Sequence, residues 1–178
     1  MNNVNSSKNR FLLLTGFMCS GKTYLGKLAA QTFGLTFVDA DACIEKCELK
    51  SIPEIFLEKG EEYFRNIETK YFKDIIKTPG KGLIIASGGG FPNKEENRLL
   101  MKKGISIFVN TDIELILDRL NSEEKQKRPL LKNIDNKEIK KLYEKRLTLY
   151  KSTADYIVNN ETELMALIKS LIKADENE

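Results

Sequence analysis

The chain alternates between short apolar runs and longer segments in which apolar residues recur with helical spacing. Short continuous apolar runs are typical of buried strands, whereas apolar residues every third or fourth position are typical of helices. The pattern predicts strands near 11–16, 35–41, 83–90, 105–110 and 155–160. It predicts helices near 22–33, 51–77, 92–103, 112–120, 136–153 and 162–173, and a helix after residue 41 that carries Cys43 and Cys47.

Strands separated by helices require crossover connections, so the predicted fold is α/β, with a mostly parallel sheet covered by helices on both faces. Ser51 and Glu54 have the spacing of a capping box, with an early Pro53, so a helix should begin there. Gly104 is placed to end the helix before the fourth strand. No repeat is visible, and 178 residues suit a single domain, residues 1–178.

Directly after the first predicted strand, residues 16–23 read GFMCSGKT, the spacing of a phosphate-binding loop. In such a loop the glycines let backbone amides surround phosphate oxygens, the lysine reaches the terminal phosphates, and the hydroxyl residue ligates Mg²⁺. The helix that follows adds the favourable end of its dipole. The alternative is an ordinary turn between a strand and a helix, but the flanking pattern favours nucleotide binding.

Two other predicted strand ends carry candidate functional residues, because ligands of open parallel sheets gather at the carboxyl ends of the strands. Asp39 and Asp41 lie two apart; if the strand continues through them, both carboxylates point the same way, one towards Mg²⁺ and one towards an acceptor hydroxyl. Asp41 could instead cap a helix. Gly88, Gly89 and Gly90 would let a ligand approach the backbone closely, or form a plain loop.

Charged and polar residues leave three further questions open. Arg65 and Glu68 share a helix face and form either a surface pair or part of a site. Arg146 is either a solvated charge or a clamp for a carboxylate, which a guanidinium grips with two bonds. The segment 121–138 is almost entirely polar and is either a solvated loop or a mobile lid, about 121–135, that closes over ATP.

Composition narrows the chemistry. The chain has no histidine, so catalysis must use carboxylates, lysine, arginine and backbone dipoles. The net charge of +3 argues against a nucleic-acid partner, and no apolar run approaches membrane-spanning length. The three cysteines offer too few ligands for a zinc site, and reduced thiols indicate a cytoplasmic protein.

Taken together, the motifs resemble those of shikimate kinases. The matching stretches occur in order over most of residues 11–158: GFMCSGKT, VDAD, SIPEIFLEKGEEYFRNIE, SGGG, RPLL and the run from KRLTLY to KSTADY. The resemblance implies a three-layer fold of the nucleoside-monophosphate-kinase type around a five-stranded parallel sheet. It also implies transfer of the γ-phosphoryl group of ATP to the 3-hydroxyl of shikimate, in the synthesis of aromatic amino acids, by a monomer that uses Mg²⁺.

The resemblance also assigns roles to residues. It implies that Lys22, Asp41 and Arg128 are catalytic and that Thr23 and Asp39 serve the metal. Nucleotide binding falls to Gly16, Cys19, Ser20, Gly21, Lys22, Thr23, Tyr24, Arg119 and Arg128. Shikimate binding falls to Asp41, Arg65, Glu68, Gly88, Gly89, Gly90 and Arg146. Cys19 stands where the family usually has glycine, a departure that bears on the backbone path of the loop.

Two other functions remain open at this point. A kinase of the same fold acting on another polyol acid, such as gluconate, would share the phosphate loop and the lid. A non-catalytic ATP-binding switch would share the loop but would not need Asp41, Arg65 and Arg146.

Overall fold

The computed structural model describes residues 11–78, 82–121 and 135–175, and within them five strands form one parallel sheet in the order β2-β3-β1-β4-β5. The strands are β1 (Leu12–Thr15), β2 (Thr36–Asp39), β3 (Leu83–Ala86), β4 (Ile105–Val109) and β5 (Tyr156–Val158). The helices are α1 (Lys22–Phe33), α2 (Ala40–Glu48), α3 (Ile52–Ile75), η1 (Phe91–Asn93), α4 (Glu95–Met101), α5 (Ile113–Arg119), α7 (Asn136–Thr153) and α8 (Glu161–Asp175).

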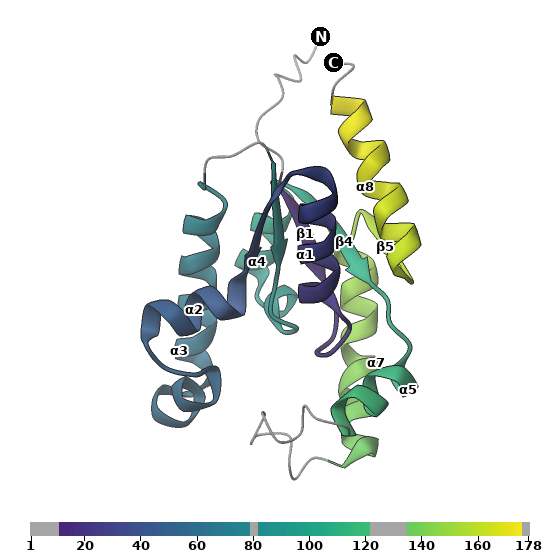
Figure 1. Ribbon diagram of the computed structural model, residues 1–178. Helices are drawn as coiled ribbons and strands as arrows, with labels where there is room; N and C mark the ends of the chain where they lie inside the picture. The colour runs from purple at the N-terminus through teal and green to yellow at the C-terminus, as the bar shows by residue number, and fades with distance from the viewer. Residues whose placement is uncertain (1–10, 79–81, 122–134, 176–178) are drawn as a thin grey trace.

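Helices cover both faces of the sheet, as predicted (Figure 1). The alternation of side chains along β1 explains the two interfaces, because successive residues point to opposite faces. Leu12 and Leu14 belong to the core that α1 and α8 complete. Phe11 and Leu13 belong to the core that α3 and α4 complete. The predicted α/β class with a five-stranded parallel sheet is therefore confirmed.

The register of the strands determines where the site can form. Ala86, the last residue of β3, pairs with Asp39 at the end of β2 and with Leu14 near the end of β1. The phosphate loop after β1, the helix after β2 and the glycines after β3 therefore start from one edge of the sheet. This is the edge at which ligands of open parallel sheets bind.

The prediction that Asp39 and Asp41 share an extended strand is wrong. β2 ends at Asp39, whose side chain accepts a hydrogen bond from the Ala42 amide and caps α2. Asp41 lies in the first turn of α2. The N-cap is thus Asp39 rather than Asp41, because the chain turns into a helix two residues earlier than the apolar pattern indicates.

Two predicted helices are interrupted. The capping box of Ser51 and Glu54 forms as predicted, but Gly60 breaks α3 with φ 79° and ψ 172°. That conformation is accessible mainly to glycine. The predicted helix 92–103 is a 3₁₀ turn, η1, followed by the short α4, because Pro92 and Gly90 shape the turn that precedes it.

Candidate active site

A cavity of about 1010 Å³ opens at the carboxyl ends of β1, β2 and β3. It brings together most of the residues that the sequence singled out. These are Cys19, Gly21, Lys22, Thr23, Tyr24, Asp39, Asp41, Arg65, Glu68, Gly88, Gly89, Gly90, Arg119 and Arg146. Gly16 and Ser20 belong to the same loop without lining the cavity, and Arg128 lies outside the described residues, with most of the predicted lid.

The loop between β1 and α1 depends on its glycines. Gly16 has φ 146°, and a Cβ there would lie 2.8 Å from the carbonyl oxygen of Val109. Gly21 caps α1 with φ 92° and offers no side chain to its first amides. Those amides and the helix dipole are therefore directed at the cavity, where they favour an anion.

Lys22 is buried and folded back onto this loop. Its Nζ donates to the carbonyl oxygens of Gly16 at 3.0 Å and Phe17 at 2.7 Å. Ser20 accepts a third, longer contact from the same ammonium at 3.4 Å. The lysine thus holds a positive charge inside the loop that the amides form.

Other side chains secure the loop from outside. Thr111, after β4, donates to the Ser20 carbonyl at 2.8 Å, and Arg119 at the end of α5 donates to the Cys19 carbonyl at 2.9 Å. Tyr24 is mostly exposed and donates to Glu161 of α8 at 3.3 Å. The nucleotide side therefore has a cationic group, Arg119, directly beside the loop.

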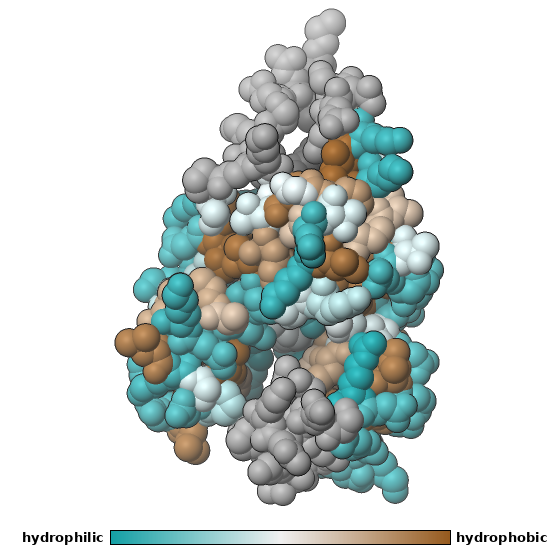
Figure 2. Space-filling model, in the orientation of Figure 1, coloured by the Kyte–Doolittle hydropathy of each residue, from teal (hydrophilic) through white to brown (hydrophobic). Residues whose placement is uncertain are grey.

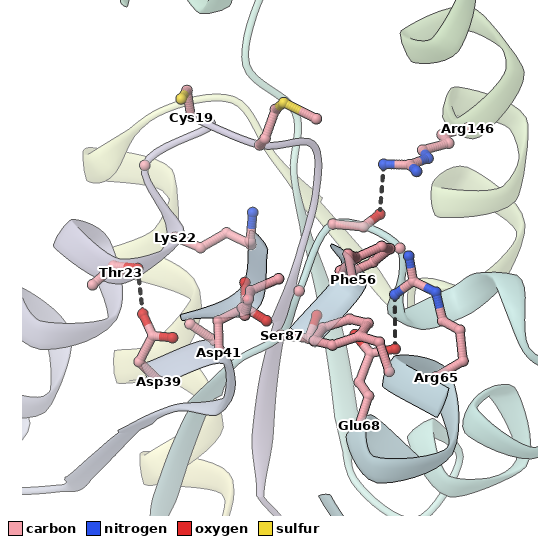
Figure 3. A pocket seen from close by; sticks show the side chains of 18 of the residues that line it. Cys19, Lys22, Thr23, Asp39, Asp41, Phe56, Arg65, Glu68, Ser87 and Arg146 are labelled. Carbon is pink, nitrogen blue, oxygen red and sulfur yellow. Dashed lines mark hydrogen bonds and ion pairs between the residues drawn. The ribbon is translucent and has the colours of Figure 1, made fainter. Parts of the chain in front are cut away.

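Cys19 has a φ of 58°, in the left-handed region that L side chains seldom adopt. This explains why glycine suits the position. The cysteine side chain is half-buried and packs against the apolar cluster of α5 and α7. Figure 3 shows Cys19 at the turn of the loop, apart from Arg65 and Glu68.

Thr23 and Asp39 form the oxygen-donor pair that a magnesium ion would need. The Thr23 hydroxyl donates to Asp39 Oδ2 at 2.6 Å (Figure 3). Mg²⁺ prefers oxygen ligands and usually combines one or two protein groups with phosphates and water, so this pair fits it. Among residues 11–78, 82–121 and 135–175, no cluster of three or more acidic, cysteine or histidine side chains could hold a metal by itself.

On the other side of the cavity, Arg65 of α3 is held by two carboxylates. Its Nη1 donates to Glu68 at 2.9 Å and its Nη2 to Glu61 at 3.2 Å. Gly90 makes room for this arginine, because a Cβ there would lie 2.4 Å from Nη2. The pair with Glu68 is therefore part of the cavity and not a surface pair.

Glu68 is almost fully buried, with only 1% of its side chain exposed. Burial raises the pKa of Glu68 to about 7, opposed by the charge of Arg65 and assisted by that of Asp41. Its Oε1 is buried and makes no hydrogen bond within the described residues. A Cβ at Gly88 would meet this oxygen at 2.8 Å and Asp41 Oδ1 at 2.7 Å, so both carboxylates converge on the glycine loop (Figure 3).

Arg146 of α7 lies above Arg65 in Figure 3, with its guanidinium directed at the glycine loop. Its guanidinium lies 5.8 Å from the ring centre of Phe17, and its Nη1 donates to the Gly89 carbonyl at 3.5 Å. Asp41, Arg65 and Arg146 thus come from three helices to one cavity. Such a set can bind a molecule that carries both hydroxyl and carboxylate groups.

Several contributors escaped the sequence analysis. Glu61 was not singled out, although it lies four residues before Arg65 on the same helix. Phe56 and Phe64 line the cavity and pack together at 4.7 Å from either side of Gly60. Tyr150, which donates to the Gly89 carbonyl, lies one turn after Arg146. Helical spacing from the two arginines is the signal that would have found Glu61 and Tyr150.

Comparison with known proteins identifies the family. The family model described as shikimate kinase matches residues 18–176. The chain belongs to the shikimate kinase family. Curated relatives include the shikimate kinase of Dictyoglomus turgidum, 46% identical over 83% of this chain and 86% of its own, and that of Aquifex aeolicus, 37% identical over 90% and 93%.

Solved structures agree with this assignment. The shikimate kinase from Acinetobacter baumannii in complex with shikimate has a TM-score of 0.82 and 30% identity, covering 95% of this chain and 96% of its own. A gluconokinase from Sinorhizobium meliloti 1021 has a TM-score of 0.54 at 13% identity and covers 95% of both chains. The gluconokinase shares the fold, whereas the shikimate kinases also share the sequence.

Proposed function

We propose that this chain transfers the γ-phosphoryl group of ATP to the 3-hydroxyl of shikimate, giving shikimate 3-phosphate and ADP. One observation carries the proposal: a phosphate loop and a set of two guanidinium and two carboxylate groups line the same cavity. Membership of the shikimate kinase family identifies the reaction class. A non-catalytic nucleotide switch would not need the second set of charges.

On the nucleotide side, we assign phosphate binding to the amides of residues 16–23, with Ser20 and Thr23, and to the ammonium of Lys22. Lys22 would leave the Gly16 and Phe17 carbonyls and turn to the terminal phosphates, because charge-assisted bonds to phosphate are stronger than bonds to neutral carbonyls. Arg119 and Tyr24 would border the nucleotide. Arg128 is assigned to the phosphates from the sequence motif RPLL alone.

Thr23 and Asp39 would hold Mg²⁺, directly or through water. When bound, the ion neutralises phosphate charge and helps to align ATP. Support comes from the 2.6 Å contact between their oxygens at the start of α1.

On the acceptor side, Arg65 and Arg146 would bind the carboxylate of shikimate, and Glu68 would orient Arg65. The backbone of Gly88, Gly89 and Gly90 would line the ring. Asp41 would bind the hydroxyls, orient the attacking one and accept its proton late in the reaction. Because the transition state of phosphoryl transfer is loose, positioning and positive charge account for most of the catalysis.

We further propose a single domain, residues 1–178, with a lid at about 121–135, that acts as a monomer in the cytoplasm on small molecules and binds no nucleic acid. Large exposed apolar side chains among the described residues include Leu49 and Leu57, and on the face shown in Figure 2 apolar residues are interspersed with polar ones. Large contiguous apolar patches on a surface mark sites of protein association. No helix in the described part of the chain has the length and apolar character to cross a membrane.

Release of ADP by the purified protein tests the proposal when it is measured with shikimate, with gluconate and without an acceptor. We expect release that depends on Mg²⁺ and on shikimate. A folded protein that binds ATP but releases no additional ADP with shikimate would contradict the proposed reaction. Faster release with gluconate would instead favour the other polyol-acid kinase.

A further inference from the structure

The hydroxyl of Tyr150 donates to the backbone carbonyl of Gly89, the middle residue of the glycine loop after β3, at 2.5 Å. The Tyr150 side chain is almost completely buried, and its ring stacks on Phe108 with centroids 5.1 Å apart. Burial raises the pKa of Tyr150 to about 12, opposed by the charge of Arg146 and a hydrogen bond with it, so the phenol keeps its proton at neutral pH. The Gly89 carbonyl is thus directed towards α7.

This orientation determines what the loop presents to the cavity. A trans peptide is planar, so the amide of Gly90 points opposite to the carbonyl of Gly89. With the carbonyl fixed on the α7 side, this amide points away from α7. On the side away from α7, the loop then offers a ligand the Gly90 amide as a donor rather than the Gly89 carbonyl as an acceptor.

Arg146 competes for the same carbonyl. Its Nη1 lies 3.5 Å from the Gly89 oxygen, at the outer limit of a hydrogen bond. A carbonyl oxygen has two lone pairs and can accept from both side chains. Because Tyr150 already makes the short bond, the carbonyl attracts Arg146 only weakly.

We propose that Tyr150 is a positioning residue of the acceptor site: its hydroxyl holds the Gly89 carbonyl on the α7 side and keeps the Arg146 guanidinium available for the carboxylate of the substrate. The inference rests on the proposed function, because it needs Arg146 to bind that carboxylate. Tyr150 touches no reacting atom and acts through Gly89 and Arg146.

The same helix provides a matched control. Tyr143 of α7 is also buried, packs on Phe17 at 5.4 Å, and donates its hydroxyl to the carbonyl of Thr111 at 3.1 Å. Thr111 in turn contacts Ser20 of the phosphate loop and not the glycine loop. Replacing either tyrosine by phenylalanine removes one hydroxyl from a bond to a loop carbonyl, that of Gly89 in one case and that of Thr111 in the other.

The test compares Tyr150→Phe and Tyr143→Phe by steady-state kinetics and by calorimetric titration with shikimate. Tyr150→Phe keeps the ring stacking, and we expect the KM and Kd for shikimate to rise about three- to tenfold, with the KM for ATP unchanged. Tyr143→Phe should leave the KM and Kd for shikimate unchanged. In an Arg146→Ala background, Tyr150→Phe should have a much smaller effect on shikimate binding, because the competing guanidinium is gone.

An unchanged Kd for shikimate in Tyr150→Phe, or an equal rise in Tyr143→Phe, would overturn the inference while wild-type turnover of shikimate upheld the proposed function. A wild-type protein that binds ATP without phosphorylating shikimate would overturn both. An unaltered KM for ATP in Tyr150→Phe shows that the variant is folded, which separates positioning from loss of structure.

Discussion

On the nucleotide side of the cavity, one contiguous stretch from Gly16 to Tyr24 supplies the loop, and most of its binding groups are backbone amides and a folded-back lysine. On the acceptor side, Asp41, Arg65 and Arg146 come from α2, α3 and α7, and their positions depend on side-chain contacts. A backbone site tolerates changes of side chain provided that its glycines remain. A site of converging charges depends on each member and on the groups that hold it.

If this distinction is correct, the largest single effect should come from Lys22, the buried side chain that carries its charge inside the phosphate loop. Lys22→Met removes the positive charge that would stabilise the transferred phosphoryl group, and we expect kcat to fall by about 10²–10³-fold. Shikimate binding, measured by titration without ATP, should be unchanged. The exposed Lys27 on the same helix is the control, and Lys27→Met should keep full activity.

A substitution on the acceptor side should affect the use of shikimate and leave ATP binding unchanged. Arg146→Ala removes a charge-assisted interaction that contributes about 1.5–3 kcal/mol, so we expect kcat/KM for shikimate to fall by about 10–100-fold with little change in the KM for ATP. Arg146→Lys should recover little, because an ammonium lacks the planar fork of a guanidinium. Near-normal kcat/KM in the lysine variant would refute the clamp.

Arg65 and Arg146 also differ from each other. Arg65 pairs with the buried Glu68, so Arg65→Ala should destabilise the fold as well as weaken binding, since it leaves a buried carboxylate without its cation. Among the described residues, Arg146 pairs with no buried carboxylate: its contacts are a 3.5 Å contact with the Gly89 carbonyl, the Phe17 ring and the Tyr150 hydroxyl, so Arg146→Ala should cost less stability than Arg65→Ala. Chemical denaturation of the two alanine variants measures this difference, and equal losses of stability would contradict it.

The same contrast explains what the sequence could predict. The spacing of GFMCSGKT identified the phosphate loop because all its members are close in sequence, and apolar runs located all five strands. Spacing alone left Arg65 and Glu68 as an ambiguous helix pair, and only the resemblance to a family assigned them. Their environment depends on residues distant in sequence, because Gly90 leaves the room for Arg65 and the charge of Asp41 helps to raise the pKa of Glu68. The helical position of Asp41 was missed because it is Asp39 whose carboxylate accepts the capping hydrogen bond, from the Ala42 amide, that begins α2.

The raised pKa of Glu68, a residue of the acceptor side, predicts that the free energy of unfolding depends on pH. Its folded-state pKa of about 7 lies above its ordinary value of 4.5, so the folded protein binds the proton more tightly than the unfolded chain. The stability from this group is present below pH 4.5 and is lost as pH rises towards 7. Relative to Glu68→Gln, the unfolding free energy of the wild type should fall by about 1–3 kcal/mol across this window.

Glu54 provides the control of opposite sign. Its bonds to the side chain and backbone of Ser51 lower the pKa of Glu54, so its contribution is present above the ordinary pKa and is lost as pH falls below it. Denaturation curves at several pH values should therefore show opposite slopes for the differences between wild type and each glutamine variant. A difference for Glu68→Gln that does not vary between pH 4.5 and 7 would contradict a raised pKa.

The smallest expected effect tests whether the nucleotide loop depends on its backbone alone. Cys19 and Leu49 are the two non-glycine residues with positive φ in the described chain, at 58° and 53°. Leu49 is 88% exposed at the end of α2, so Leu49→Gly relieves strain without loss of packing and should stabilise the protein by about 1 kcal/mol. Cys19 packs on the cluster around Phe17, so Cys19→Gly should gain less stability than Leu49→Gly.

Thermal unfolding measures the stability of both variants, and we expect the KM for ATP to be unchanged in Cys19→Gly. A larger gain at Cys19 than at Leu49 would mean that its side chain strains the loop, and an altered KM for ATP would mean that the thiol contributes to the nucleotide site.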